Sequence, residues 1–76
     1  MQQLRAFFVD ENIGRQNRIF EIREEDSDDS IVYEIFSSGI YLFTMSADGD
    51  LLFNSQSNQM QTTELNLLIE NIKKQI

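Results

Sequence analysis

Residues 31–53 read IVYEIF, SSG, IYLFTM, SADGD and LLF, three apolar segments separated by two short polar ones. The apolar segments are rich in β-branched and aromatic residues, which pack well on a pleated surface. Each polar segment holds a glycine, at Gly39 and Gly49, that can adopt the positive φ of a tight turn. The pattern predicts two consecutive hairpins and therefore an antiparallel meander.

Both turns fit a three-residue loop, made of residues 37–39 and 47–49, in which glycine closes a type I turn. Strict alternation then divides the strand residues between two faces, and a two-residue loop at either turn would shift that division by one. One face is wholly apolar or aromatic: Ile31, Tyr33, Ile35, Tyr41, Phe43, Met45, Leu51 and Phe53. The other is mixed: Val32, Glu34, Phe36, Ile40, Leu42, Thr44, Ser46 and Leu52. The cleaner partition favours three-residue loops.

Two further strands are predicted before this meander. Residues 4–9 form the first, and residues 10–14 supply turn chemistry after it. The second begins at residue 15 or 18 and ends at residue 23. In it Phe20 and Ile22 face one side, with Ile19, Glu21 and Arg23 on the other. Residues 24–30 hold five carboxylates and no apolar side chain, so we expect a flexible acidic loop there.

The C-terminal part of the chain predicts one amphipathic helix. Residues 54–61 have no periodicity and form a polar connector, after which Thr62 or Thr63 can cap a helix over residues 62–76. Its apolar residues recur at the spacing of one helical face: Leu65, Leu68, Ile69, Ile72 and Ile76. Burying each is worth roughly 1.5–3 kcal/mol before entropy is counted, so this helix must dock on the sheet.

The predicted fold is a single α+β domain over residues 1–76, an antiparallel meander sheet of about four or five strands with one C-terminal helix packed on one face. A helix is about 10 Å wide and strands lie about 4.8 Å apart, so one helix shields two or three strands of one face. We therefore expect the mixed face to stay open as an interface, which Leu4, Phe8 and Ile19 could extend. The predicted interface residues are Val32, Glu34, Phe36, Ile40, Leu42 and Leu52.

The composition argues against the common catalytic and cofactor chemistries. With no His and no Cys, the chain lacks the usual proton shuttle, thiol nucleophile and soft metal ligands. Isolated glycines cannot form a phosphate loop, and neither Asp26 with Asp28 nor Asp48 with Asp50 fits an EF-hand. We predict no catalytic residue, no cofactor and no metal site.

Charge and hydropathy indicate which classes of partner and which cell compartment to expect. The net charge is −7, and five of the negative charges lie in residues 24–29, while the six basic residues are scattered. Binding to nucleic acid is disfavoured because it needs clustered Lys and Arg. No apolar stretch reaches the ~18 residues of a membrane span and no signal region is apparent, so we expect a cytoplasmic protein without a membrane partner.

The function class that these observations favour is a noncatalytic protein-interaction or regulatory module that forms a homodimer through the open sheet face or a free edge. Loops could instead cover that face, or it could bind a different protein or an apolar ligand. A second hypothesis is an acidic decoy that binds a basic partner surface through a docking loop of Glu24, Glu25, Asp26, Asp28 and Asp29. A third is a carboxylate-dependent enzyme that uses Glu34 with Tyr41 or Thr44.

Overall fold

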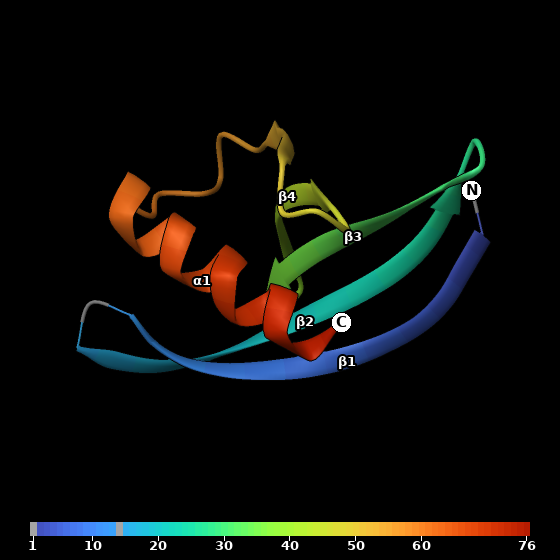
Figure 1. The fold of residues 1–76 in the computed structure, drawn as a ribbon. Helices are drawn as coiled ribbons and strands as arrows, with labels where there is room; N and C mark the ends of the chain where they lie inside the picture. The colour runs from blue at the N-terminus through green and yellow to red at the C-terminus, as the bar shows by residue number, and fades with distance from the viewer. Residues whose placement is uncertain (1, 14) are drawn as a thin grey trace.

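The structure, a computed structural model, describes residues 2–13 and 15–76, with side chains from Leu4 onward. It confirms the α+β fold, a five-stranded antiparallel meander of order β1-β2-β3-β4-β5 followed by one helix (Figure 1). The elements are β1 (Gln2–Ile13), β2 (Gln16–Ser27), β3 (Ser30–Ser37), β4 (Ile40–Ser46), β5 (Leu51–Asn54) and α1 (Thr62–Gln75). Within the described residues, no helix has the length and apolar character of a membrane span.

The first two strands are longer than predicted. Residues 10–13, expected to form a turn, continue β1, and Ile13 pairs with Gln16. Gly14 lies outside the described residues. The structure also differs from the acidic loop expected at residues 24–30, because Glu24 to Ser27 extend β2. The chain reverses at Asp28 and Asp29, whose φ angles of 47° and 67° suit a two-residue turn.

The turn between β3 and β4 contains two residues, so the three-residue prediction was wrong there. Ser37 pairs with Ile40, and Ser38 and Gly39 both have positive φ, at 51° and 79°. Pairing then shifts between Ile35, which opposes Phe43, and Phe36, which opposes Tyr41. The extra residue in this β-bulge is Leu42.

The turn between β4 and β5 has the three-residue loop that the sequence predicts. The Gly49 N–H donates to the Ser46 carbonyl at 3.0 Å, and the Ser46 N–H donates to the Asp50 carbonyl at 2.9 Å. Gly49 has a φ of 91°, as a glycine closing a type I turn requires. A second shift, in which Thr44 opposes Phe53 and Met45 opposes Leu51, leaves Leu52 as an extra residue in β5.

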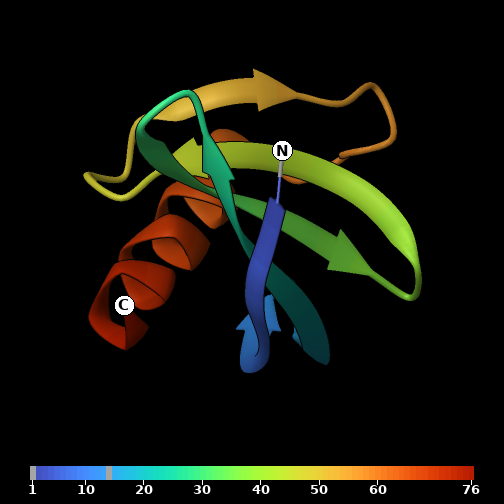
Figure 2. The ribbon, with the colours of Figure 1, turned by 90° about the vertical axis from the view of Figure 1, so that its right-hand side faces the viewer.

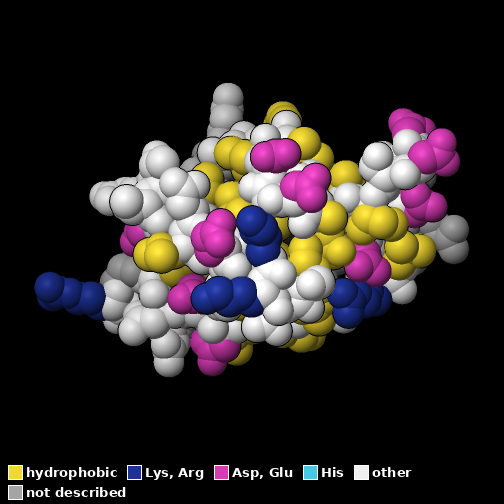
Figure 3. Space-filling view, viewed as in Figure 1, with side chains coloured by type: hydrophobic (Ala, Val, Ile, Leu, Met, Phe, Trp, Pro, Cys, Tyr) yellow, Lys and Arg dark blue, Asp and Glu magenta, His cyan; other side chains and the backbone are white. Residues whose placement is uncertain are grey.

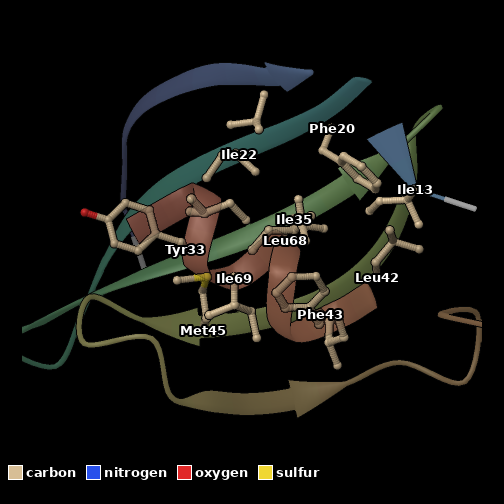
Figure 4. Packing of buried hydrophobic residues seen from close by; sticks show 13 residues of the cluster. Ile13, Phe20, Ile22, Tyr33, Ile35, Leu42, Phe43, Met45, Leu68 and Ile69 are labelled. Carbon is tan, nitrogen blue, oxygen red and sulfur yellow. The ribbon is translucent and has the colours of Figure 1, made fainter. Parts of the chain in front are cut away.

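The core lies between α1 and one face of the sheet (Figures 1 and 4). Its buried members are Val9, Ile13, Phe20, Ile22, Tyr33, Ile35, Leu42, Phe43, Met45, Leu65, Leu68, Ile69 and Ile72. The predicted orientation of Phe20 and Ile22 in β2 is confirmed, as is the docking face of the helix apart from Ile76, which is 37% exposed. The helix is capped by Gln61, whose N–H donates to the Glu64 carboxylate, rather than by either threonine.

Candidate functional site

The sheet face turned away from α1 is only partly shielded by its own side chains. Its central rows follow from the strand pairing: Phe8, Glu21, Phe36 and Tyr41 in one row, and Ala6, Arg23, Glu34, Thr44 and Phe53 in the next. Ile19 and Glu25 on β2 and Val32 on β3 flank these rows. We call this set of residues the open face.

The structure places the six predicted interface residues in different settings. Val32, Glu34 and Phe36 lie half-buried on the open face. Leu52 is 54% exposed in the bulge of β5. Ile40, also 54% exposed, pairs with Ser37 in the same row as Phe20, so its predicted place on the open face was wrong and it lies on the helix side at the start of β4. The assignment of Leu42 was wrong, because the bulge in β4 buries its side chain in the core with only 4% exposed.

The same bulges bring two aromatic residues to the open face that the sequence pattern assigns to the core. Tyr41 packs edge-on against Phe36, with ring centroids 5.6 Å apart and an interplanar angle of 63°. Phe53 stacks on Tyr41 at 6.2 Å and 20°. The Tyr41 hydroxyl is hydrogen-bonded to Thr44. The three rings therefore form an aromatic strip across β3, β4 and β5, and Phe53 at its end is 61% exposed.

An arginine borders this aromatic strip on β2. The guanidinium carbon of Arg23 lies 3.9 Å from the centroid of the Phe36 ring, within the range of a cation–π contact. Its Nε donates to the Glu21 carboxylate at 2.8 Å. This hydrogen bond lowers the pKa of Glu21 and raises that of Arg23. Arg23 is thus held flat on the sheet surface between a ring and a carboxylate.

Two carboxyl groups lie next to each other on the open face. Glu34 opposes Arg23, and Glu25 lies diagonally from Glu34 on β2. A hydrogen bond to Glu25, together with burial and the negative charge of Glu25, raises the pKa of Glu34 to about 7, and Arg23 opposes this shift. Glu25 Oε2 is buried without a hydrogen-bond partner among the described residues. This pair can hold a proton near neutral pH.

The acidic residues predicted as a docking loop are divided by the end of β2. Glu24 is on the helix side, where its carboxylate lies 3.3 Å from Arg5 Nε and accepts a 2.9 Å hydrogen bond from the Tyr33 hydroxyl. Asp26, Asp28 and Asp29 are exposed. Acidic side chains gather at this tip of the hairpin (Figure 3, upper right). Among the described residues, no group of three or more acidic residues is arranged to hold a metal ion.

A cavity of about 410 Å³ lies on the helix side of the sheet, away from the open face. It is lined by Ile13, Gln16, Arg18, Leu42, Ser57, Asn58, Gln59, Met60 and Glu64. Arg18 is held there by a 3.2 Å hydrogen bond to Ser37 Oγ and lies 5.0 Å above the Phe20 ring. Glu34 is not among the lining residues, so the carboxyl pair does not stand in this cavity.

The outer edge of β1 is also free. β1 is the first strand of the sheet, and the backbone hydrogen bonds found outside regular elements involve none of its residues within the described parts of the chain. Of the elements described, β1 is the lowest in Figure 1, and Figure 2 shows the same strand nearly end-on. Phe8, near its middle, is 71% exposed, the highest value among the large apolar residues described. The sequence indicates this strand but not its length, because Asp10, Glu11 and Asn12 read as a turn.

Comparisons of the chain with protein-family models, with curated proteins and with solved structures found no significant match.

Proposed function

We propose that this protein is a noncatalytic interaction module of the cytoplasm that self-associates through the sheet face turned away from α1 or through the free edge of β1. The observation that carries the proposal is the exposure of large apolar side chains there: 71% for Phe8, 62% for Ile19 and 61% for Phe53. Phe8 and Ile19 are diagonal neighbours on β1 and β2, whereas Phe53 lies on β5 at the far end of the open face. Exposed apolar patches on a small protein mark interaction sites. A second copy presents the same patch, as a two-fold interface requires.

The polar groups of the open face support a contact role rather than catalysis. Arg23 donates hydrogen bonds to Glu21, and Glu34 lies beside Glu25, which raises the pKa of Glu34. Catalysis by Glu34 with Tyr41 or Thr44 needs these groups within hydrogen-bond reach of one another. The two hydroxyl groups are bonded to each other instead, and no hydrogen bond among the described residues joins either to Glu34. Polar side chains held in fixed orientations near the centre of a contact surface can make that contact specific.

The acidic decoy has less support as an alternative. Of its five proposed docking residues, Glu24 is engaged by Arg5 and Tyr33, and Glu25 by Glu34. The remaining three aspartates are confined to one hairpin tip, whereas a phosphate mimic needs charges spaced along a surface.

Light scattering after gel filtration tests the proposal. At ~50 µM the wild-type chain should elute with twice its monomer mass of 8.9 kDa. Phe8→Glu places a charge in the apolar patch and should weaken association at least about tenfold. The matched control is Leu67→Glu, because Leu67 is 66% exposed on α1 and lies opposite the buried side of the helix. A monomer mass for the wild-type chain, or equal loss in both variants, would contradict the proposal.

A further inference from the structure

The edge of β1 has the features of a strand-pairing surface. It runs through twelve residues, contains no proline and has one register irregularity, between Gln3 and Arg5. Natural edge strands are usually protected by short length, proline, bulges or inward-pointing charge, and of these β1 has the irregularity near its start and the helix-facing charges of Arg5 and Glu11. From Arg5 to Ile13 the strand pairs with β2 without a bulge, and this continuous stretch leaves alternate backbone N–H and C=O groups directed outward.

Symmetry restricts how a second copy can add to this edge. Two β1 strands related by a two-fold axis run antiparallel, and directly opposed residues then point to the same side of the sheet. Residues of β1 that face the helix, such as Val9, must therefore oppose helix-facing residues of the partner. The numbers of two opposed residues must therefore add to an even number. As a result, one residue of β1 opposes its own copy, and the two-fold axis passes between these two residues.

Charge selects among the registers that remain. Arg5 is the only basic residue of β1, and Glu11 shares its helix-facing side. Glu11 Oε2 accepts a hydrogen bond from Asn71 on α1, so its other carboxylate oxygen is the one that can meet Arg5 of a second copy. With the axis at Phe8, Arg5 of each copy opposes Glu11 of the other, so the dimer contains two such charge pairs. With the axis at Phe7, Arg5 opposes Val9; with the axis at Val9, Glu11 opposes Phe7. On the helix side both alternatives set a charge against an apolar side chain, whereas opposite charges across two strands stabilise the pair. On the open face Asp10 opposes an apolar residue in all three registers, so it does not distinguish them.

The apolar residues fit the same register. On the helix side, Phe7 opposes Val9 of the second copy, so the two cores become continuous; Val9 is buried and Phe7 packs against the core already. On the open face, Phe8 opposes itself at the axis, which covers its exposed ring. Arg5 can keep its contact with Glu24, because a guanidinium has five N–H donors for two carboxylates.

We propose that two copies of this chain pair edge to edge through β1, with Phe8 on the two-fold axis and Arg5 opposite Glu11, to form one continuous ten-stranded sheet. This inference rests on the proposed self-association and specifies its contact. Both helices then lie on one side of the joined sheet, and the two aromatic strips lie on the other.

Single-cysteine crosslinking tests the geometry directly, because the natural chain has no cysteine. Opposed residues have Cβ atoms about 4.5–5.5 Å apart, so oxidised Phe8→Cys should run as a covalent dimer on a denaturing gel. Ile19→Cys is the matched control: Ile19 is 62% exposed on the same face, one strand further in, and should stay monomeric on that gel. Arg5→Glu and Glu11→Arg should each weaken association about three- to tenfold, and the double variant should restore it.

The mass of each sample before oxidation separates the two proposals. A dimer with the Phe8→Cys crosslink and with charge-swap rescue supports the edge contact. A wild-type dimer without rescue by the charge swap, or with efficient crosslinking at Ile19→Cys, overturns the edge contact while self-association stands. A wild-type monomer overturns both. If Phe8→Cys itself fails to associate, the charge-swap series decides, because it leaves Phe8 in place.

Discussion

The guanidinium of Arg23 stacks on the ring of Phe36 at 3.9 Å from its centroid, while its Nε donates to Glu21. The planar group thus makes two contacts that a point charge could make only in part. Arg23→Lys should therefore lower the midpoint urea concentration of unfolding. Lys74→Gln, at the exposed end of α1, is the control and should leave that midpoint nearly unchanged. Equal effects would show that the stacking contributes no stability.

Leu42 lies on the opposite side of the sheet from the one that the sequence predicts. Its side chain is buried in the core, whereas Ile40, two residues earlier, is 54% exposed. Leu42→Ala should cost about 2–5 kcal/mol of unfolding free energy, and Ile40→Ala less than about 1 kcal/mol. The reverse order would contradict the bulge in β4.

The two described glycines with positive φ differ in the space around them. A Cβ at Gly39 meets no atom within 4 Å, whereas a Cβ at Gly49 comes within 2.5 Å of Lys73 Cδ. Gly39→Ala should cost about 1–2 kcal/mol from backbone strain alone, and Gly49→Ala should cost more because Lys73 must also move. Gly39→Asn should recover part of the loss, since Asn tolerates the left-handed region. A cost for Gly49→Ala below that of Gly39→Ala in urea titrations would contradict the contact with Lys73.

The carboxyl pair of the open face predicts a pH dependence. The pKa of Glu34 is raised from its ordinary value of 4.5 to about 7 by its hydrogen bond to Glu25 and by burial. The folded chain therefore binds this proton more tightly than the unfolded chain. The stabilisation is complete below the ordinary value and is lost as the pH rises through about 7.

Thermal unfolding at fixed protein concentration should show this loss. Between about pH 5 and pH 8 the melting temperature should fall more steeply for the wild-type chain than for Glu34→Gln, which carries no titrating group. Glu70→Gln, on the exposed side of α1, should keep the wild-type slope. Identical slopes for the wild type and Glu34→Gln would show that the pair holds no proton near neutral pH.

The alternation of the sequence was enough to predict much of the fold. In β2 the sides taken by Phe20 and Ile22 follow from the period of two, and in α1 the buried side follows from the helical period. The three-residue turn at Gly49 also follows from local chemistry, because a glycine closes it. These features depend on residues close together in the chain.

The open face could not be predicted fully, because it depends on the pairing of whole strands. The segment Ser37-Ser38-Gly39 is compatible with two loop lengths, and only the bulge at Leu42 reconciles the shorter one with a buried Phe43. That bulge moves Tyr41 to the other side of the sheet. Likewise Asp28 and Asp29 make a turn by themselves, so pairing with β3 draws Glu24 and Glu25 into β2. In both places the pairing between strands, rather than the local preference of the sequence, determines the structure.

Sedimentation equilibrium of the unmodified chain over about 1–100 µM is the most direct test of self-association through the exposed surface. The mass should rise with concentration to twice 8.9 kDa and no further, because a two-fold contact closes on itself. A mass that stays at 8.9 kDa throughout would contradict it.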